Sequence, residues 1–140
     1  FTVPHDAREP LQLRCTDGAR TLGVLTDLGH ASAHVMTRLQ GLQALVLESN
    51  HDPELLAQSS YPPFLKRRVG GNYGHLSNQA AAQIARAVHH AGLRHVLAAH
   101  LSEQNNRPEL VRALLAEALG TRPEDVLTAN AAEGSCWLDA

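Results

Sequence analysis

Several features typical of secreted, membrane and nucleic-acid-binding proteins are scarce in this 140-residue sequence. Its two cysteines, Cys15 and Cys136, fit no metal-ligand spacing and are too few for a disulfide framework. No apolar run approaches the length of a membrane span, and no signal-peptide pattern opens the chain. Lys and Arg number 12 against 14 acidic residues, so the net charge of −2 creates no global basic field. We therefore expect a cytoplasmic protein without a membrane partner, whose phosphate contacts would have to be local.

Histidine is the residue in excess, with nine copies beside one Trp, two Tyr and two Phe. Because histidine is both a common metal ligand and an acid–base group near neutral pH, this composition favours metal or acid–base chemistry. Five of the nine are interpreted as structural or surface residues: His30, His34, His89, His90 and His95. The other four are candidates for chemistry.

Alternating strand and helix patterns predict an α/β layered sheet. Residues 11–16 alternate apolar and polar side chains, which predicts a half-buried strand with Leu11, Leu13 and Cys15 on its apolar side. A hairpin turn at Asp17-Gly18 leads into the next strand. The predicted strands cover residues 1–3, 11–16, 20–26, 44–47, 96–99, 126–128 and 136–138.

Helices are predicted where apolar residues recur every three or four positions between capping residues. Ser77 is expected to cap a helix that stops at Gly92, and Asn106 with Glu109 forms a capping box for a helix that stops at Gly120. The predicted helices cover about 31–39, 53–56, 77–91 and 106–119.

Four polar residues, His5, Asp27, Glu48 and His100, each follow a predicted strand. Ligands of α/β sheets bind outside the carboxyl ends of the strands, so these side chains are expected to share one rim. Two histidines and a carboxylate there would form a site of nitrogen and oxygen ligands, suited to Zn or Mn. Spacing alone leaves a second interpretation open, in which Asp27 caps the next helix and the histidines are ordinary rim residues.

Four segments resemble those of metallo-β-lactamase-fold hydrolases, in particular the bacterial YycJ-like group of phosphodiesterases and nucleases. In chain order they are TDLG at 26–29, LESNHD at 47–52, GHLSN at 74–78 and HLSEQNN at 100–106. The resemblance covers nearly the whole chain. It implies that residues 1–140 are the C-terminal part of an αββα sandwich, one mixed sheet with flanking helices, and that the complete protein is a two-metal phosphodiesterase or nuclease.

The resemblance also implies roles for individual residues. His5, Asp27 and His100 correspond to metal ligands, with Asp27 bridging two divalent ions, either Zn or Mn. His75 corresponds to a histidine that faces the scissile phosphate and protonates the leaving group, and Glu48 corresponds to the residue that orients its ring.

The family's first metal motif, His-x-His-x-Asp-His, has no counterpart in this sequence. The chain is therefore expected to hold half of a metal site and to be inactive alone. The remaining ligands would come from a missing N-terminal half or from a second copy of the chain. An isolated half of the sandwich is expected to expose the apolar inner face of its sheet.

The basic group Lys66-Arg67-Arg68 has two interpretations, a contact with the phosphates of a nucleic acid or a solvated helix face. Asn50 and His51, beside Glu48, are expected to line the substrate groove. Two other functions stay open: a hydrolase of the same fold acting on a thioester or lactone, and a non-catalytic half-domain that assembles with a partner.

Overall fold

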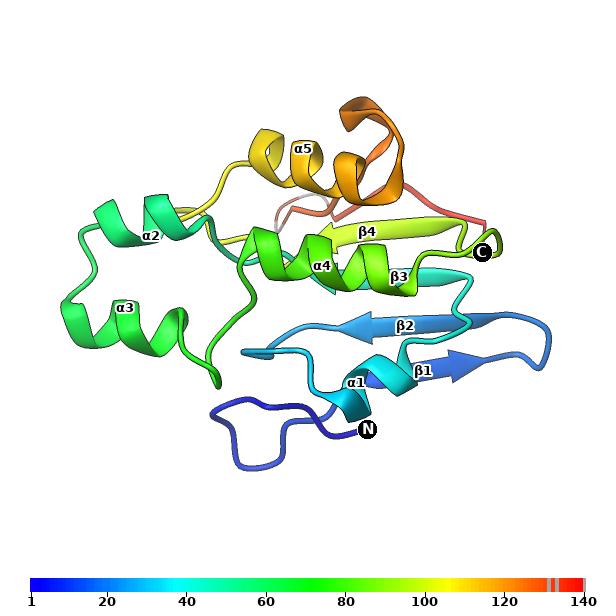
Figure 1. The fold of residues 1–140 in the computed structure, drawn as a ribbon, viewed down its shortest axis with the longest axis horizontal. Helices are drawn as coiled ribbons and strands as arrows, with labels where there is room; N and C mark the ends of the chain where they lie inside the picture. The colour runs from blue at the N-terminus through cyan, green and yellow to red at the C-terminus, as the bar shows by residue number, and fades with distance from the viewer. Residues whose placement is uncertain (131, 133, 140) are drawn as a thin grey trace.

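A computed structural model describes residues 1–130, 132 and 134–139 and contains one mixed five-stranded sheet (Figure 1). The strand order is β1-β2-β3-β4-β5, with β1 antiparallel to β2 and all other neighbours parallel. The α/β class expected from the sequence is thereby confirmed. The strands are β1 (Leu13–Thr16), β2 (Thr21–Leu25), β3 (Ala44–Glu48), β4 (His95–Ala99) and β5 (Leu127–Thr128).

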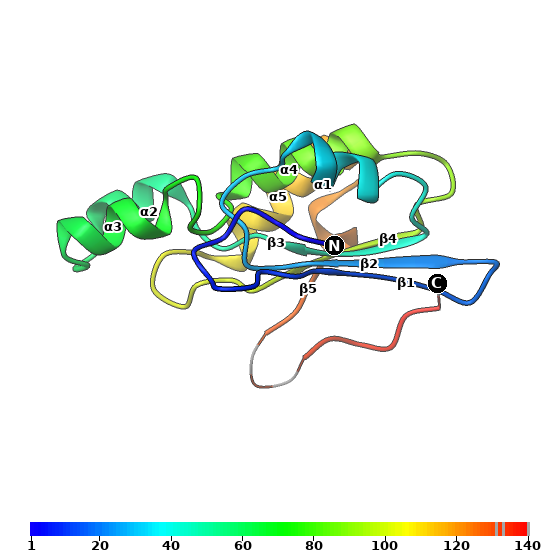
Figure 2. The ribbon, with the colours of Figure 1, turned by 90° about the horizontal axis from the view of Figure 1, so that it is seen from below.

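The helices cover one face of this sheet, and two of them extend past its edge. Figure 2 shows α1, α4 and α5 on the same side of the strands, whereas α2 and α3 project beyond the carboxyl ends of β2, β3 and β4. Within the described residues, no helix has the length and apolar character needed to cross a membrane. The helices are α1 (Ala33–Arg38), α2 (Pro53–Gln58), α3 (Pro63–Val69), α4 (Asn78–Val88), α5 (Pro108–Leu119) and the 3₁₀ turn η1 (Pro123–Asp125).

Helix starts follow the sequence better than helix ends. The Ser77 side chain accepts a hydrogen bond from the Ala80 N–H at the start of α4, as expected. The predicted stop at Gly92 is wrong, because α4 already ends at Val88. The capping box at Asn106 is also wrong, because the N-cap of α5 is Arg107 and the Asn106 side chain is engaged elsewhere.

The two faces of the sheet differ in burial. Leu25, Leu45 and Leu47 point to the helix-covered face and are almost fully buried in the core. The cross-strand register places the alternate apolar residues on the opposite face, where Leu13 is 58% and Leu22 is 36% exposed. Figure 2 shows no helix of the described chain on that side. We call this surface the open face and define it by Leu13, Leu22, Val24, Val46 and Leu97.

Three strand expectations are corrected by the structure. All four residues of β1 are exposed, because β1 is an edge strand and its apolar side belongs to the open face. Gln12 is buried instead, and its side chain accepts a hydrogen bond from the Thr26 N–H. Residues 1–3 form only an isolated bridge, from Thr2 to Leu11, and residues 136–138 form no strand.

Candidate metal centre

Four side chains converge where the parallel strands β2, β3 and β4 end. Asp27 follows β2, Glu48 ends β3, His100 follows β4, and His75 precedes α4. Each offers one ligand atom such that all four atoms lie within 4.8 Å of one another. The parallel register explains this, because Glu48 pairs with Ala99 and so brings the ends of β3 and β4 level. We call these four residues the rim cluster.

Glu48 is the buried centre of the rim cluster and is 0% exposed. Its Oε1 accepts hydrogen bonds from Nδ1 of His75 at 2.9 Å and Nδ1 of His100 at 2.6 Å. Its two oxygens also accept three backbone N–H groups, those of Asp27, Leu28 and Leu76. A carboxylate with five donors holds the surrounding loops in one arrangement.

These donors also decide the charge of Glu48. Burial raises the pKa of its carboxyl group, but the hydrogen bonds from His100, His75 and the Leu76 N–H outweigh burial and lower the pKa to about 2. Glu48 is therefore ionised at neutral pH. The hydrogen bond to Glu48 also raises the pKa of His100, although burial of the ring opposes this shift.

Asp27 is the central carboxylate among three histidines. Its Oδ1 lies 3.8 Å from Nδ1 of His75, 3.8 Å from Nδ1 of His100 and 3.9 Å from Nε2 of His5. These separations are too long for hydrogen bonds. The Nδ1–H groups of His75 and His100 donate hydrogen bonds to Glu48 and not to Asp27. The Asp27 side chain, which is 45% exposed, is therefore available to a cation.

His5 lies beside the rim cluster and comes from the N-terminal loop rather than from the end of a strand. Its Nδ1 donates to the Gly74 carbonyl at 2.9 Å, which leaves Nε2 at 3.6 Å from Asp6 Oδ1 and 3.9 Å from Asp27 Oδ1. The His75 ring lies between the other two, with centroids 5.2 Å from both His5 and His100. A neutral imidazole nitrogen beside a carboxylate oxygen is a donor set that suits a divalent metal, so these residues fit such an ion.

The backbone at two of these residues has an uncommon conformation. Asp27 has φ 53° and His100 has φ 57°, and both are non-glycine residues in the left-handed region. Such conformations are less costly for Asp and His than for most residues and concentrate at functional sites. His100 is held in place by Asn50, whose side-chain amide donates to the His100 carbonyl at 2.9 Å.

The structure separates the five residues expected to bind substrate into two groups. Asn50 and His51 are buried, at 8% and 3% exposure, so neither lines an open groove within the described chain. Arg68 instead lines a pocket of about 230 Å³ together with His5, Asp27 and His75. It also forms an ion pair with Asp6.

The other two basic residues of α3 do not line that pocket. The Lys66 ammonium donates to the Ala57 carbonyl of α2. Arg67 is exposed, and its side chain has no hydrogen-bond or ion-pair partner among residues 1–130, 132 and 134–139. The basic group therefore lies on a helix, and Arg68 is the member that lines the pocket at the candidate site.

A buried amide network behind the rim cluster was not anticipated. The side chains of Asn78 and Asn106 exchange two hydrogen bonds of 2.9 Å, and Asn106 also donates to the Ser49 carbonyl. Both amides are at most 3% exposed. The network connects three segments that follow Glu48, His75 and His100 in the sequence. The only signal in the sequence is the repeated His-Leu-Ser, each copy followed within four residues by Asn.

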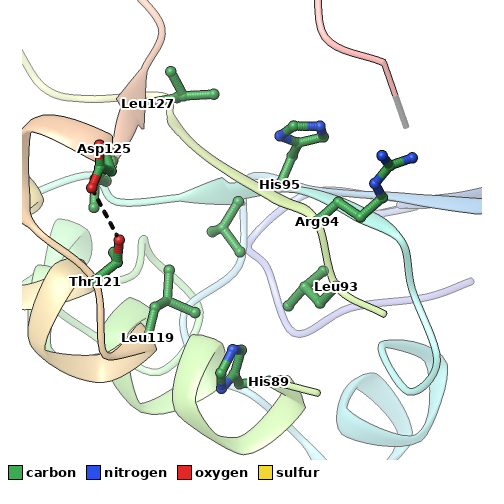
Figure 3. Close-up of a pocket in the computed structure, with 10 residues that line it drawn as sticks. His89, Leu93, Arg94, His95, Leu119, Thr121, Asp125 and Leu127 are labelled. Atoms are coloured by element: carbon green, nitrogen blue, oxygen red, sulfur yellow. Dashed lines mark hydrogen bonds between the residues drawn. The ribbon is translucent and has the colours of Figure 1, made fainter. Parts of the chain in front are cut away.

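A second pocket, of about 270 Å³, lies at the opposite end of β4 (Figure 3). His89 enters it from the end of α4, His95 from the start of β4 and Asp125 from η1. The Asp125 carboxylate binds Arg122 and accepts from the Thr121 hydroxyl. Over the described part of the chain, only the rim cluster gathers three or more potential metal ligands, so this second pocket is not a candidate metal centre.

Comparison with curated proteins shows two similar nucleases, and no protein-family model matches the chain. The sequence is 38% identical over 119 residues to exodeoxyribonuclease YycJ of Bacillus anthracis, covering 85% of this chain and 45% of that protein. It is 31% identical over 119 residues to exodeoxyribonuclease WalJ of Streptococcus pneumoniae, covering 85% and 44% respectively. The chain thus spans less than half the length of the curated relatives that it matches.

A solved structure gives an independent comparison of the fold. The metallo-β-lactamase fold protein YhfI from Bacillus subtilis superposes with a TM-score of 0.69 at 20% sequence identity. The match covers 98% of this chain and 46% of that one. At this identity the similarity concerns the fold.

Proposed function

We propose that this chain, which is similar to two exodeoxyribonucleases and shares its fold with a metallo-β-lactamase fold protein, forms the C-terminal part of a metal-dependent exodeoxyribonuclease. The observation that carries the proposal is the rim cluster, with Asp27 facing three histidines around the buried, ionised Glu48. The printed names of the curated relatives supply the substrate class. The resemblance stated from the sequence motifs is confirmed by the same comparisons.

His5, Asp27 and His100 are the proposed metal ligands of this chain. Asp27 lies between the histidines and is the residue suited to bridge two Zn or Mn ions. His5 and His100 each have Nδ1 bonded to a fixed acceptor, which leaves Nε2 as the ligand atom. A pair of divalent ions, when bound, would supply a nucleophilic hydroxide and neutralise charge on a phosphate.

His75 is the proposed proton donor, and Glu48 is its positioning residue. Nδ1–H of His75 donates a hydrogen bond to Glu48, so a second proton carried on Nε2 would be the one passed to the leaving oxygen of a phosphodiester, which leaves the ring neutral with Nδ1–H still bonded to Glu48. The pocket lined by His75, Asp27 and Arg68 is large enough for a phosphate group beside these residues. Because Glu48 stays ionised, it keeps the His75 ring in this orientation.

We divide the proposed substrate contacts into direct and indirect candidates. Arg68 lines the pocket and Arg67 is exposed on the same helix, so we assign phosphate contacts to them. The Lys66 ammonium donates a hydrogen bond to the Ala57 carbonyl, so Lys66 is a weaker candidate for a phosphate contact. We assign Asn50 a positioning role, because it holds the His100 backbone, and leave His51 as a buried neighbour of the site.

The open face supports the proposal that the other half of the sandwich packs on this chain. Leu13 is 58% exposed at the edge of a sheet whose other face is covered by helices. A missing N-terminal half would cover this surface and supply the remaining metal ligands, and a second copy of the chain is the alternative occupant. In an αββα sandwich the two sheets face each other, so an apolar open face is expected.

The proposal is tested by replacing His75 with Ala in the complete protein. We expect at least a hundred-fold loss of DNA cleavage with the metal content nearly unchanged, because His75 moves a proton and is not assigned as a ligand. His34→Ala, on the exposed side of α1, is the matched control and should cleave normally. Unchanged cleavage by His75→Ala would contradict the assignment. Faster turnover of a thioester than of bis-p-nitrophenyl phosphate would instead favour the small-molecule hydrolase.

A further inference from the structure

Phe64 is a large apolar side chain that stays 65% exposed beside the pocket at the rim cluster. It belongs to α3, and three other residues of α3 line the pocket: Leu65, Arg68 and Val69. Residues four apart on a helix are neighbours on one face, so Phe64 lies one turn from Arg68. Phe64 is therefore at the outer edge of the pocket and takes no part in the hydrophobic core.

The position of α3 relative to His75 is fixed by backbone contacts. The Val69 carbonyl accepts a hydrogen bond from the His75 N–H at 2.8 Å. Gly74 packs so closely that a Cβ there would lie 2.1 Å from the Arg68 carbonyl oxygen and 2.3 Å from that of Val69. Only glycine fits at this position. The distance from Phe64 to the proposed proton donor is thus set by the fold.

The charge around Phe64 complements a polyanion. Lys66, Arg67 and Arg68 give α3 three cationic side chains, and α3 contains no acidic residue. Arg67 has no side-chain partner in the part of the chain that the structure describes. An exposed aromatic ring beside unpaired arginine is the combination by which proteins bind unpaired nucleotides, with the ring stacking on a base and the cation on the backbone.

We propose that Phe64 stacks on an unpaired nucleobase of the DNA end whose phosphodiester is held at the rim cluster. This inference rests on the proposed nuclease function and adds a base-binding subsite to it. Phe64 and Val69 are separated by five residues, about 7.5 Å along the helix axis. Because Arg68 and Val69 of the same helix line the pocket, the stacked base belongs to a nucleotide close to the cleaved bond. Stacking is tolerant of sequence, so the subsite recognises an unpaired base of any identity.

The test measures binding of dye-labelled oligonucleotides to the complete protein by fluorescence anisotropy. Phe64→Ala is expected to weaken binding of single-stranded DNA about 5- to 100-fold, as loss of one base stack does. Phe64→Trp should bind within about twofold of the wild type, whereas Phe64→Leu should be as weak as Phe64→Ala, because leucine is apolar but cannot stack. Leu110→Ala, an exposed apolar residue of α5, is the control and should leave affinity unchanged.

Two further arms separate stacking from general adhesion. An oligonucleotide without bases in its last three positions should bind wild type and Phe64→Ala alike, because no base is left to stack. Phe64→Trp should lose more fluorescence than the wild type on binding normal DNA, and this additional loss should be absent on binding the abasic strand. The wild type, which carries Trp137, supplies the background signal.

Equal weakening of normal and abasic DNA by Phe64→Ala would overturn the inference, as would full affinity of Phe64→Leu. Either result leaves the proposed function standing if the wild type cleaves DNA and His75→Ala does not. Absence of cleavage by the wild type would instead contradict the proposed function itself. The two failures are therefore distinguishable.

Discussion

The histidines at the two ends of β4 differ in what binds their ring nitrogens. At the carboxyl end, Nδ1–H of His75 and of His100 each donates a hydrogen bond to Glu48, which leaves Nε2 for the proposed proton transfer at His75 and for the proposed metal contact at His100. At the amino end, His90 donates from Nε2 to the Leu42 carbonyl and accepts the Gly92 N–H at Nδ1. Both nitrogens of His90 are thus occupied. His95 donates from Nε2 to the Asp139 carbonyl.

The carboxylates at the two ends of β4 also differ in the groups that they contact. Asp27 at the carboxyl end has an oxygen facing three histidines, whereas Asp125 at the amino end is bonded to Arg122 and Thr121. A count of histidines therefore says little about metal binding. What matters is a carboxylate free of cationic partners and an imidazole with one nitrogen fixed and the other free.

The largest effect that would test this comparison is on metal affinity. Asp27→Asn in the complete protein should weaken Zn or Mn binding at least about 100-fold, because the central carboxylate ligand loses its charge. Asp125→Asn should change affinity less than about twofold, because that carboxylate already has Arg122. Isothermal titration with each ion measures both. Equal losses for the two variants would break the comparison.

The next largest effect is expected at Glu48, which orients the rings of His75 and His100. Glu48→Gln keeps the side-chain volume but puts an amide where His75 and His100 donate, and we expect metal affinity to fall about 10- to 100-fold. The buried site should also lose roughly 3 kcal/mol of unfolding free energy, since its donors are left without an ionised acceptor. Glu54→Gln, exposed on α2, is the control for charge alone.

The pH dependence of the metal-free chain sharpens the same point. The pKa of Glu48 lies at about 2 in the folded chain, against 4.5 as its ordinary value. The folded pKa is depressed, so this group stabilises the fold fully above pH 4.5, and its contribution disappears as pH falls toward 2. We expect urea unfolding to show a loss of up to about 3 kcal/mol over that window. A similar loss in Glu48→Gln would show that other groups are responsible.

The sheet and the positions of its polar ends could be predicted from the sequence because they depend on local patterns. The apolar runs 44–47 and 96–99 are β3 and β4, and Asp27, Glu48 and His100 follow strands as expected. Burial of β1 was predicted wrongly for a physical reason. Alternation shows that Leu11, Leu13 and Cys15 share a side, but not whether another layer covers it. The helix Pro63–Val69 was not among the predicted helices, because its apolar residues do not form a buried stripe.

Contacts between distant loops could not be predicted from the sequence. The motifs paired Glu48 with His75 but did not indicate that His100 shares the same oxygen. Asn106 looked like a helix cap, because its role in a buried amide pair depends on Asn78, 28 positions away. Asn50 and His51 were expected in the groove, yet β3 continues into a buried loop there. Each of these depends on tertiary packing, which local periodicity does not encode.

The smallest effect is expected at the amino end itself, and it is the most direct control. His95→Ala removes one hydrogen bond, to the Asp139 carbonyl near the end of the chain, so the unfolding free energy should fall by only about 1 kcal/mol. Metal content and metal affinity should not change, because His95 is at the far end of β4 from the rim cluster. His100→Ala, just beyond the carboxyl end of β4, should reduce both metal content and metal affinity. If His95→Ala instead released metal, the second pocket would have to contribute to the metal site, and the two ends of β4 could no longer be assigned different roles.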